Sequence, residues 1–487
     1  MRKRFDHQMK LGQTPISEIY VDPKSKNALD QLIVALKAIY CNKEYNEKIF
    51  SIIEKYMPKV AKNNGRPGMD LWTIFVLGHV RLCLNYSYDM LHHQANNDRL
   101  LRQLLGIVDE LGIKPYTFEY QTIYDNVKLL NEAVLVEIND VIVGFGHKEV
   151  FKKKENTALN LKTDSFVVES NVHFPTDYNL LGDCCRKCLD MVDDFLEKYP
   201  EIDGWRKVKN WRSEIKYLMR EVGRASKSGG KKKAEKLQNV VTSYLTKCRT
   251  LQFKLVLEKM FFPILDETDL ARHYALEYYM KLANKHIDLV DRRILKGEVI
   301  PHEEKMMSIF EDYTEMILKG KFRPSMEFGK LLSITTDQYG LILLHKVMNE
   351  EQDRDIVIEI TDVLLNKYKL IASMSFDKGH WSKDNKALLE LEIPTVILPK
   401  LGKRTVVEEE FEISKKFKRL KNKHSAIESN INELEHRGLD RCPDRSYFHF
   451  CTYIAMGVCA YNLKKIGKKI LSNRLEEALS QKVRKAA

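Results

Sequence analysis

The 487-residue chain is long enough for about two to four domains, and its 44% hydrophobic and 30% charged residues are typical of a soluble globular protein. It has no apolar stretch of membrane-spanning length and no signal-peptide core, and its nine cysteines have no paired spacing, so we expect a cytoplasmic protein with reduced thiols. The net charge of +12 favours a polyanionic partner, of which DNA and RNA are the commonest.

The N-terminal part of the chain is predicted to be helical. Residues 27–60 have a helical apolar period, and the Asn-Asn-Gly-Arg-Pro-Gly cluster that follows predicts a loop. Residues 69–84 and 87–97 predict two helices around a tight turn, which is either a helix-turn-helix or a plain helical hairpin. A further amphipathic helix is expected at residues 119–143. The arginines near the helix pair are Arg66, Arg81, Arg99 and Arg102.

The first predicted strand, residues 157–174, contains Asp164 in the middle of an apolar run. Aspartate is depleted from strand interiors because its short polar side chain competes with the ladder, so this carboxylate needs another explanation. Residues 180–318 return to a helical pattern, interrupted by the basic stretch 223–233, and predict a helical insertion. The motif "CCRKC" (184–188) has one C-x-x-C without a second pair and is therefore a weak zinc candidate.

The β pattern resumes at 330–337 and 340–348, which predicts a hairpin. Helices and strands then alternate over residues 353–368, 369–377, 382–391 and 394–399. This alternation indicates a mixed sheet, and the whole chain is expected to be α+β and mostly helical. A long helix at about 407–436 and a final apolar helix complete the pattern.

Asp377 ends a predicted strand, and ligands collect at the carboxyl ends of strands in open α/β sheets. The alternative is an ordinary turn aspartate in Asp-Lys-Gly.

The long helix predicted after Asp377 has an apolar seam with spacings of four and three residues. The seam consists of Ile413, Phe417, Leu420, His424, Ile427, Ile431 and Leu434. At about 100° per residue, Glu428 lies just off the seam, Glu435 lies beside it, and Glu433 points into solvent. Glu428 or Glu435 is thus a carboxylate at the edge of the core, unless this flank is simply solvated. A histidine inside such a seam is more often a core residue than a ligand.

Three carboxylates on two strands and a closing helix suit a pair of Mg²⁺ ions, which prefer hard oxygen ligands. Two such metals, roughly 3.5–4 Å apart, stabilise the attacking and leaving oxygens of a phosphoryl transfer. A metal partner would explain the aspartate inside a strand.

With its carboxylates in this order, the chain resembles bacterial DDE transposases of insertion sequences, in particular a group long filed as not classified. The order and spacing of the matching stretches carry the resemblance, which leaves the helical block 185–320 uncovered. These stretches are "NGRPGMD" (64–70), "LKTDSFVVESNVHFPTDYNLL" (161–181), "SFDKGHWSKDN" (375–385), "AIESNINELEHRGLDRC" (426–442) and "FHFCTYIAMGVCAYNLKKIG" (448–467).

The resemblance implies a ribonuclease-H-like catalytic core with a mixed sheet. That core would comprise residues 156–184 and 325–470, with a helical insertion at 185–324. An N-terminal helical, DNA-binding domain would span residues 1–155, and a basic tail would span 471–487.

The implied catalytic and metal-binding residues are Asp164, Asp377 and Glu428, holding two Mg²⁺ or Mn²⁺ ions. Glu435 is a rival for the third position. The weaker candidates are Glu169 and Asp177 for the first position, whereas Asp337 is expected in a hairpin turn. Related transposases often have an arginine and a lysine where this chain has His424 and Glu435, so this part of the DNA-contacting signature is missing.

The implied activity is metal-dependent strand cleavage at transposon ends followed by strand transfer to target DNA. The implied partner is double-stranded DNA, bound by a homodimer in a bacterial, nucleoid-associated setting. Two alternatives remain: a non-catalytic or repurposed DNA-binding relative, and a nuclease of the same fold without strand transfer. The DNA-contact candidates are Arg66, Lys378, His424, Lys415, Lys416, Lys418 and Arg419, together with the "SGGKKK" stretch.

Overall fold

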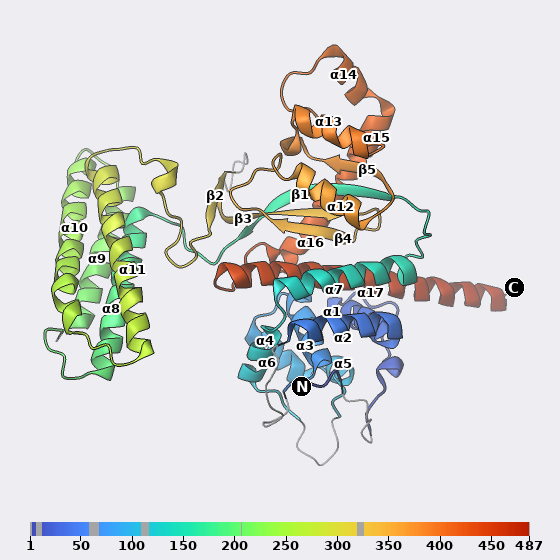
Figure 1. Ribbon diagram of the computed structural model, residues 1–487, viewed down its shortest axis with the longest axis horizontal. Coiled ribbons are helices and arrows are strands. Elements are labelled where there is room, and N and C mark those ends of the chain that lie inside the picture. Colours follow the sequence, from blue (N-terminus) through green and yellow to red (C-terminus); the bar gives the residue numbers. More distant parts are fainter. Residues whose placement is uncertain are drawn as a thin grey trace. The chain divides into compact units, whose positions relative to one another are not determined.

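The computed structural model describes residues 2–5, 12–57, 68–108, 116–205, 207–318 and 326–486. The chain divides into two compact units (Figure 1). The core unit comprises Met1–Asn171 and Ile317–Ala487, and the helical unit comprises Val172–Met316. Arg66 lies outside the described residues. Among the described helices, none is both long and apolar enough to cross a membrane.

The core unit begins with helices that pack around α3. Every residue of α3 (Leu71–Cys83) is buried, because α1, α6 and the long C-terminal α17 (Tyr447–Ala486) pack against it. The other N-terminal helices are α1 (Ala28–Cys41), α2 (Lys43–Tyr56), α4 (Tyr88–Asn97), α5 (Arg99–Leu104), α6 (Tyr120–Val127) and α7 (Glu132–Phe145). The single helix expected at 119–143 is wrong, since Asn131 starts α7 by accepting a hydrogen bond from the Val134 N–H.

The α3–α4 pair has the features of a plain helical hairpin. Arg81 is buried, and its guanidinium donates to both carboxylate oxygens of Asp444, at 2.9 and 2.7 Å. Arg102 is also buried and donates to the carbonyl oxygen of Tyr116 at 3.1 Å. These two arginines therefore stabilise the packing of the helices. Arg99, the remaining described candidate near the helix pair, is exposed.

A mixed sheet forms the centre of the core unit. Its strands are β1 (Leu159–Glu169), β2 (Glu315–Leu318), β3 (Met326–Thr336), β4 (Ile342–Val347), β5 (Ile371–Phe376) and β6 (Val396–Ile397). The strand order is β2-β3-β1-β5-β6, with β4 also paired to β3. The β1–β3 and β3–β4 pairs are antiparallel, whereas β1–β5 and β5–β6 are parallel. The α+β, mostly helical fold with a mixed sheet is thus confirmed.

The predicted hairpin between β3 and β4 is confirmed, and Asp337 forms its turn. The side chain of Asp337 accepts hydrogen bonds from the N–H groups of Tyr339 and Leu341. Gly340 adopts a φ of +76°, which a glycine tolerates without strain.

Helices connect and cover the parallel part of the sheet. α12 (Val357–Lys367) joins β4 to β5, and α13 (Lys383–Glu392) joins β5 to β6. The single helix predicted at 407–436 is wrong, because Ser414 and Ser425 divide it. Its parts are α14 (Val406–Ile413), α15 (Lys415–His424) and α16 (Ala426–Leu434). Glu433, expected in solvent, is half-buried and forms an ion pair with Lys464 of α17.

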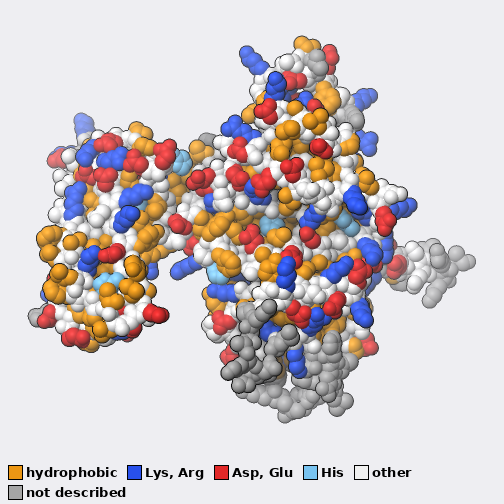
Figure 2. All heavy atoms as spheres, in the orientation of Figure 1, with side chains coloured by type: hydrophobic (Ala, Val, Ile, Leu, Met, Phe, Trp, Pro, Cys, Tyr) orange, Lys and Arg blue, Asp and Glu red, His pale blue; other side chains and the backbone are white. Residues whose placement is uncertain are grey.

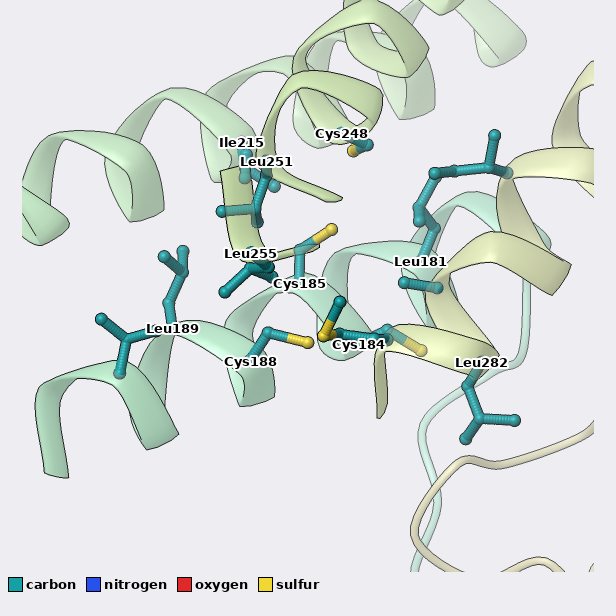
Figure 3. Packing of buried hydrophobic residues seen from close by; sticks show 14 of the residues in the cluster. Leu181, Cys184, Cys185, Cys188, Leu189, Ile215, Cys248, Leu251, Leu255 and Leu282 are labelled. Carbon is teal, nitrogen blue, oxygen red and sulfur yellow. The ribbon is translucent and has the colours of Figure 1, made fainter. Parts of the chain in front are cut away.

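The helical unit contains four long helices, α8 (Asp177–Lys198), α9 (Val208–Lys227), α10 (Lys233–Glu258) and α11 (Glu267–Val290). The cysteines of the "CCRKC" motif lie in its core among leucines, and Figure 3 shows Cys248 of α10 facing the same cluster. Burial raises the pKa of Cys184 and Cys188 above the usual thiol value. Thiols that stay protonated pack as small hydrophobic groups, so this cluster serves the core of the unit.

Candidate active site

The register of two parallel strands brings Asp164 and Asp377 together. Along β1 and β5, Lys162 pairs with Ser375 and Thr163 pairs with Phe376. Asp377 directly follows this last pair and therefore stands beside Asp164 on the neighbouring strand. Neighbouring strands are about 4.8 Å apart, and in-register side chains point to the same face of a sheet. The two carboxylates, separated by more than two hundred residues of sequence, are therefore neighbours.

The electrostatics of Asp164 reveal a larger acidic group. Burial is the main cause that raises the pKa of Asp164 to about 7. The Ser165 N–H, which donates to Asp164 Oδ1 at 2.8 Å, opposes that rise. The negative charges of Asp377, Asp353 and Glu428 raise the pKa further. Four carboxylates thus share one electrostatic environment at the end of β5.

Glu428 reaches this group from the closing helices. It lies in the first turn of α16, which packs on β1, and its neighbour Ile427 is fully buried and anchors the helix. Glu428 itself is exposed. The rival Glu435 begins a π-helical turn, Glu435–Leu439, and is half-buried.

Asp353 is a member of the group that sequence analysis missed. It is half-buried in the loop before α12, and its Oδ1 accepts a hydrogen bond from Ser165 Oγ at 2.6 Å. A Cβ placed on Gly379, just after Asp377, would lie 2.8 Å from Asp353 Oδ2. A glycine at position 379 therefore leaves room for this carboxylate. In the sequence, Asp353 is hidden among the other acidic residues of the 350–355 loop.

Two histidines lie beside the carboxylates. His424 Nδ1 is 3.0 Å from Ser375 Oγ, and burial lowers the pKa of His424 to about 4 although the Asp377 charge opposes this. His380 is fully buried, and burial lowers its pKa despite the charges of Asp353 and Asp377. Within the described residues, neither ring nitrogen of His380 has a hydrogen-bond partner. His424 stays a predicted DNA contact, and as a neutral imidazole it would reach a phosphate as a hydrogen-bond donor and not as a cation.

The donor set fits a hard divalent cation. Carboxylate oxygens are the ligands that Mg²⁺ and Mn²⁺ prefer, and a partly buried aspartate with a raised pKa marks a place where negative charge lacks compensation. As the described side chains are placed, no three His, Cys, Asp or Glu residues converge closely enough to hold a metal ion. Binding would therefore need side-chain rearrangement among Asp164, Asp377, Asp353 and Glu428.

Exposed basic side chains lie on the helix that packs against β5 and directly after Asp377. α15 packs against β5, and its residues Lys415, Lys418 and Arg419 are exposed. These three cations form no ion pair with a described carboxylate. Lys378, next to Asp377, is also exposed, whereas the side chain of Lys416 lies outside the described set. Figure 2 shows lysine and arginine side chains along the upper part of the core unit, where α14 and α15 lie.

The weaker candidates have other roles. Asp177 belongs to the helical unit, where it forms an ion pair with Arg293 at 2.8 Å. Glu169 ends β1 and bridges to Arg441 through the backbone. Asp337 shapes the β3–β4 turn, and its Oδ2 lies 2.6 Å from His147 Nε2.

No family model matches the chain, and neither the curated proteins nor the solved structures include a match. Function must therefore be inferred from the fold and the acidic site.

Proposed function

We propose that this chain is a DDE-type DNA transposase with a ribonuclease-H-like core, in which Asp164, Asp377 and Glu428 hold the catalytic divalent ions. The adjacency of Asp164 and Asp377 on parallel strands carries the proposal. The charge of Glu428 acting on Asp164 supports the third position. A mixed sheet with its first aspartate on the central strand and a helical insertion after that strand agrees with such a core.

Two basic surfaces support DNA as the partner. One is the exposed face of α15 beside the acidic site. The other is a stripe along α9, where cations recur every three or four residues on the side opposite the buried Ile215 and Val222. At about 1.5 Å per residue the stripe is roughly 27 Å long, which is comparable to most of a turn of B-DNA. The stripe consists of Lys209, Arg212, Lys216, Arg220, Arg224 and Lys227. Arg212 and Arg224 are already ion-paired, Arg212 with Asp190 and Asp193 of α8 and Arg224 with Glu221, so the other four cations are the ones available for phosphates.

In the proposed mechanism, bound divalent ions would activate the attacking hydroxyl and neutralise the charge that develops on the phosphate. The chain's own residues would position these groups. Asp164 would release its proton near neutral pH to become a ligand, and Ser165 would hold Asp353 in place. Lys378 and the α15 cations would bind neighbouring phosphates. The neutral His380 and His424 would fill the space behind the carboxylates without adding charge.

The test uses the full chain with Mg²⁺ or Mn²⁺ and duplex DNA carrying the ends that flank its coding sequence. We expect cleavage at those ends and joining of the 3′ end to a target duplex. The variants Asp164→Asn, Asp377→Asn and Glu428→Gln should lose both steps, whereas Asp362→Asn, an exposed carboxylate on α12, should keep them. Cleavage without joining would indicate the nuclease alternative, and binding without cleavage would indicate a non-catalytic relative.

A further inference from the structure

The helical unit exposes an unusual number of large apolar side chains where α10 passes into α11. Met260 and Leu265 are each 76% exposed and Phe253 is 67% exposed. Figure 2 shows hydrophobic side chains grouped toward the lower end of this unit. We call this surface the outer apolar face. It consists of Phe253, Val256, Leu257, Met260, Phe261, Ile264, Leu265, Leu270, Tyr274 and Tyr278.

Helical geometry shows that this face is separate from the core of the unit. On α10, Leu251 and Leu255 are buried in the core. At about 100° per residue, Phe253, Val256 and Leu257 lie about 100–200° away from Leu255, on the solvent side. The last turns of α10 are therefore apolar on both sides, a pattern that is typical of a buried helix.

α11 repeats the pattern. Leu276 and Ala283 are buried in the core, whereas Leu270, Tyr274 and Tyr278 follow each other every four residues on the opposite side. α10 and α11 contact each other, and both stripes lie at the helix ends that residues 259–266 connect, so the exposed apolar residues of the two helices flank this connection.

The area of this face matches that of a protein interface. Added together, the exposed fractions of these ten side chains equal about six fully exposed side chains. Aromatic side chains have roughly 150–250 Å² each, so the four aromatic members alone, exposed by 45–67%, present roughly 350–600 Å², and the six aliphatic members add to this. A standard interface buries about 800 Å² on each partner. Monomeric proteins rarely expose a contiguous apolar patch of this size.

The charges at the rim are compatible with a second copy of the same surface. They are paired with one another, so two identical rims do not repel strongly, and a polyanion would gain little from them. The rim ion pairs are Lys254–Glu258 at 3.5 Å, Lys259–Glu277 at 2.8 Å and Lys198–Asp266 at 2.6 Å. We propose that two copies of this chain dimerise through the outer apolar face, in a two-fold arrangement in which each copy contributes the same residues.

This inference goes beyond the proposed function and beyond the homodimer expected on DNA, because it assigns the contact to one surface and requires neither DNA nor catalysis. The test compares the full chain with a triple variant, Phe253→Ser, Met260→Ser and Tyr274→Ser. Analytical ultracentrifugation over a range of concentrations measures the dissociation constant. A control variant changes three apolar residues that are exposed elsewhere, Tyr217→Ser, Val299→Ser and Leu391→Ser. All six side chains are already solvated, so both variants should fold, and circular dichroism checks this.

We expect the native chain and the control variant to dimerise, and the triple variant to associate at least about tenfold more weakly, because large side chains dominate interface energies. A native chain that stays monomeric at every concentration would overturn the proposal. So would a triple variant that dimerises as tightly as the control. A monomer whose outer apolar face is protected from solvent in footprinting would show that the core unit of the same chain covers it, which also overturns the proposal.

Discussion

Asp377 stands next to Asp164 on the neighbouring parallel strand, directly after the Thr163–Phe376 pair that fixes the register. This adjacency concentrates negative charge, neither carboxylate forms an ion pair with a described cation, and burial raises the pKa of Asp164 to about 7. Ionised Asp164 thus lowers the stability of the folded chain, and a bound cation would offset this loss.

The pH dependence of stability should show this cost. Because the pKa of Asp164 is higher in the folded state than its ordinary value of 3.8, the folded chain holds a proton that the unfolded chain has lost. Stability from this group is present below about pH 4 and is lost as the pH rises to about 7. We expect metal-free Asp164→Asn to be more stable than the native chain by about 1–3 kcal/mol above pH 7, with a smaller gain at about pH 5.

Urea denaturation with a chelator present measures this difference. Asp362→Asn serves as the control and should change stability by less than about 0.5 kcal/mol. A constant difference between Asp164→Asn and the native chain across the pH range would contradict the prediction.

Metal binding should be coupled to proton release. Mg²⁺ or Mn²⁺ competes with the proton on Asp164, so the apparent affinity should increase as the pH rises toward 7 and then level off. Isothermal titration calorimetry in two buffers of different ionisation enthalpy measures the released protons. Asp164→Asn and Asp377→Asn should bind the ion at least about tenfold more weakly, and equal proton release from Asp164→Asn would contradict this assignment.

The DNA-cleavage rates of two variants should show whether Glu428 or Glu435 is the third metal ligand. Glu428→Gln should lower the rate of DNA cleavage by at least about 10²-fold, because it removes the proposed third metal ligand, whose charge acts on Asp164. Glu435→Gln should keep cleavage within a few-fold of the native chain. The opposite result would transfer the third position to Glu435, and circular dichroism of both variants checks that folding is preserved.

Gly379 and Asp353 should be energetically coupled. A methyl group on Gly379 would lie 2.8 Å from Asp353 Oδ2, so Gly379→Ala must displace that carboxylate and weaken its bond to Ser165. We expect a loss of about 1 kcal/mol in the native background and almost none in the Asp353→Ala background. Additive losses in this double-mutant cycle would mean that the glycine does not make room for Asp353.

The α9 stripe should contribute to DNA binding through phosphate contacts. The variant Lys216→Gln, Arg220→Gln and Lys227→Gln removes three stripe cations that form no described ion pair. The slope of log K against log salt should become shallower by about 2–3, at about 0.9 per contact. A control removes three exposed cations of the same unit, Lys236→Gln, Lys281→Gln and Lys285→Gln, and should leave the slope near the native value. Equal slopes for the two variants would mean that the α9 stripe makes no phosphate contacts.

Local patterns determined much of the fold in advance. Apolar periodicity located the strand that contains Asp164, the β3–β4 hairpin and most helices, because side-chain burial repeats with the period of each element. It failed at helix boundaries. The side chains of Ser414 and Asn131 each cap a new helix within a segment predicted as one helix, whereas the break at Ser425 has no side-chain cap. An apolar seam predicts which face of a helix is buried, but it does not predict where one helix ends and the next begins in a new direction.

Residue order and apolar periodicity were enough to predict one carboxylate inside a strand, a second at a strand end and a third on an apolar helix. That these groups are neighbours could not be predicted in this way, since the register of β1 on β5 depends on pairing between segments far apart in the chain. The tertiary structure also added Asp353, whose partner Ser165 lies 188 residues away, and it showed that burial lowers the pKa of His424 to about 4. The electrostatic environment of a side chain depends on its burial and on its distances to other charges, and neither can be read from the order of residues along the chain.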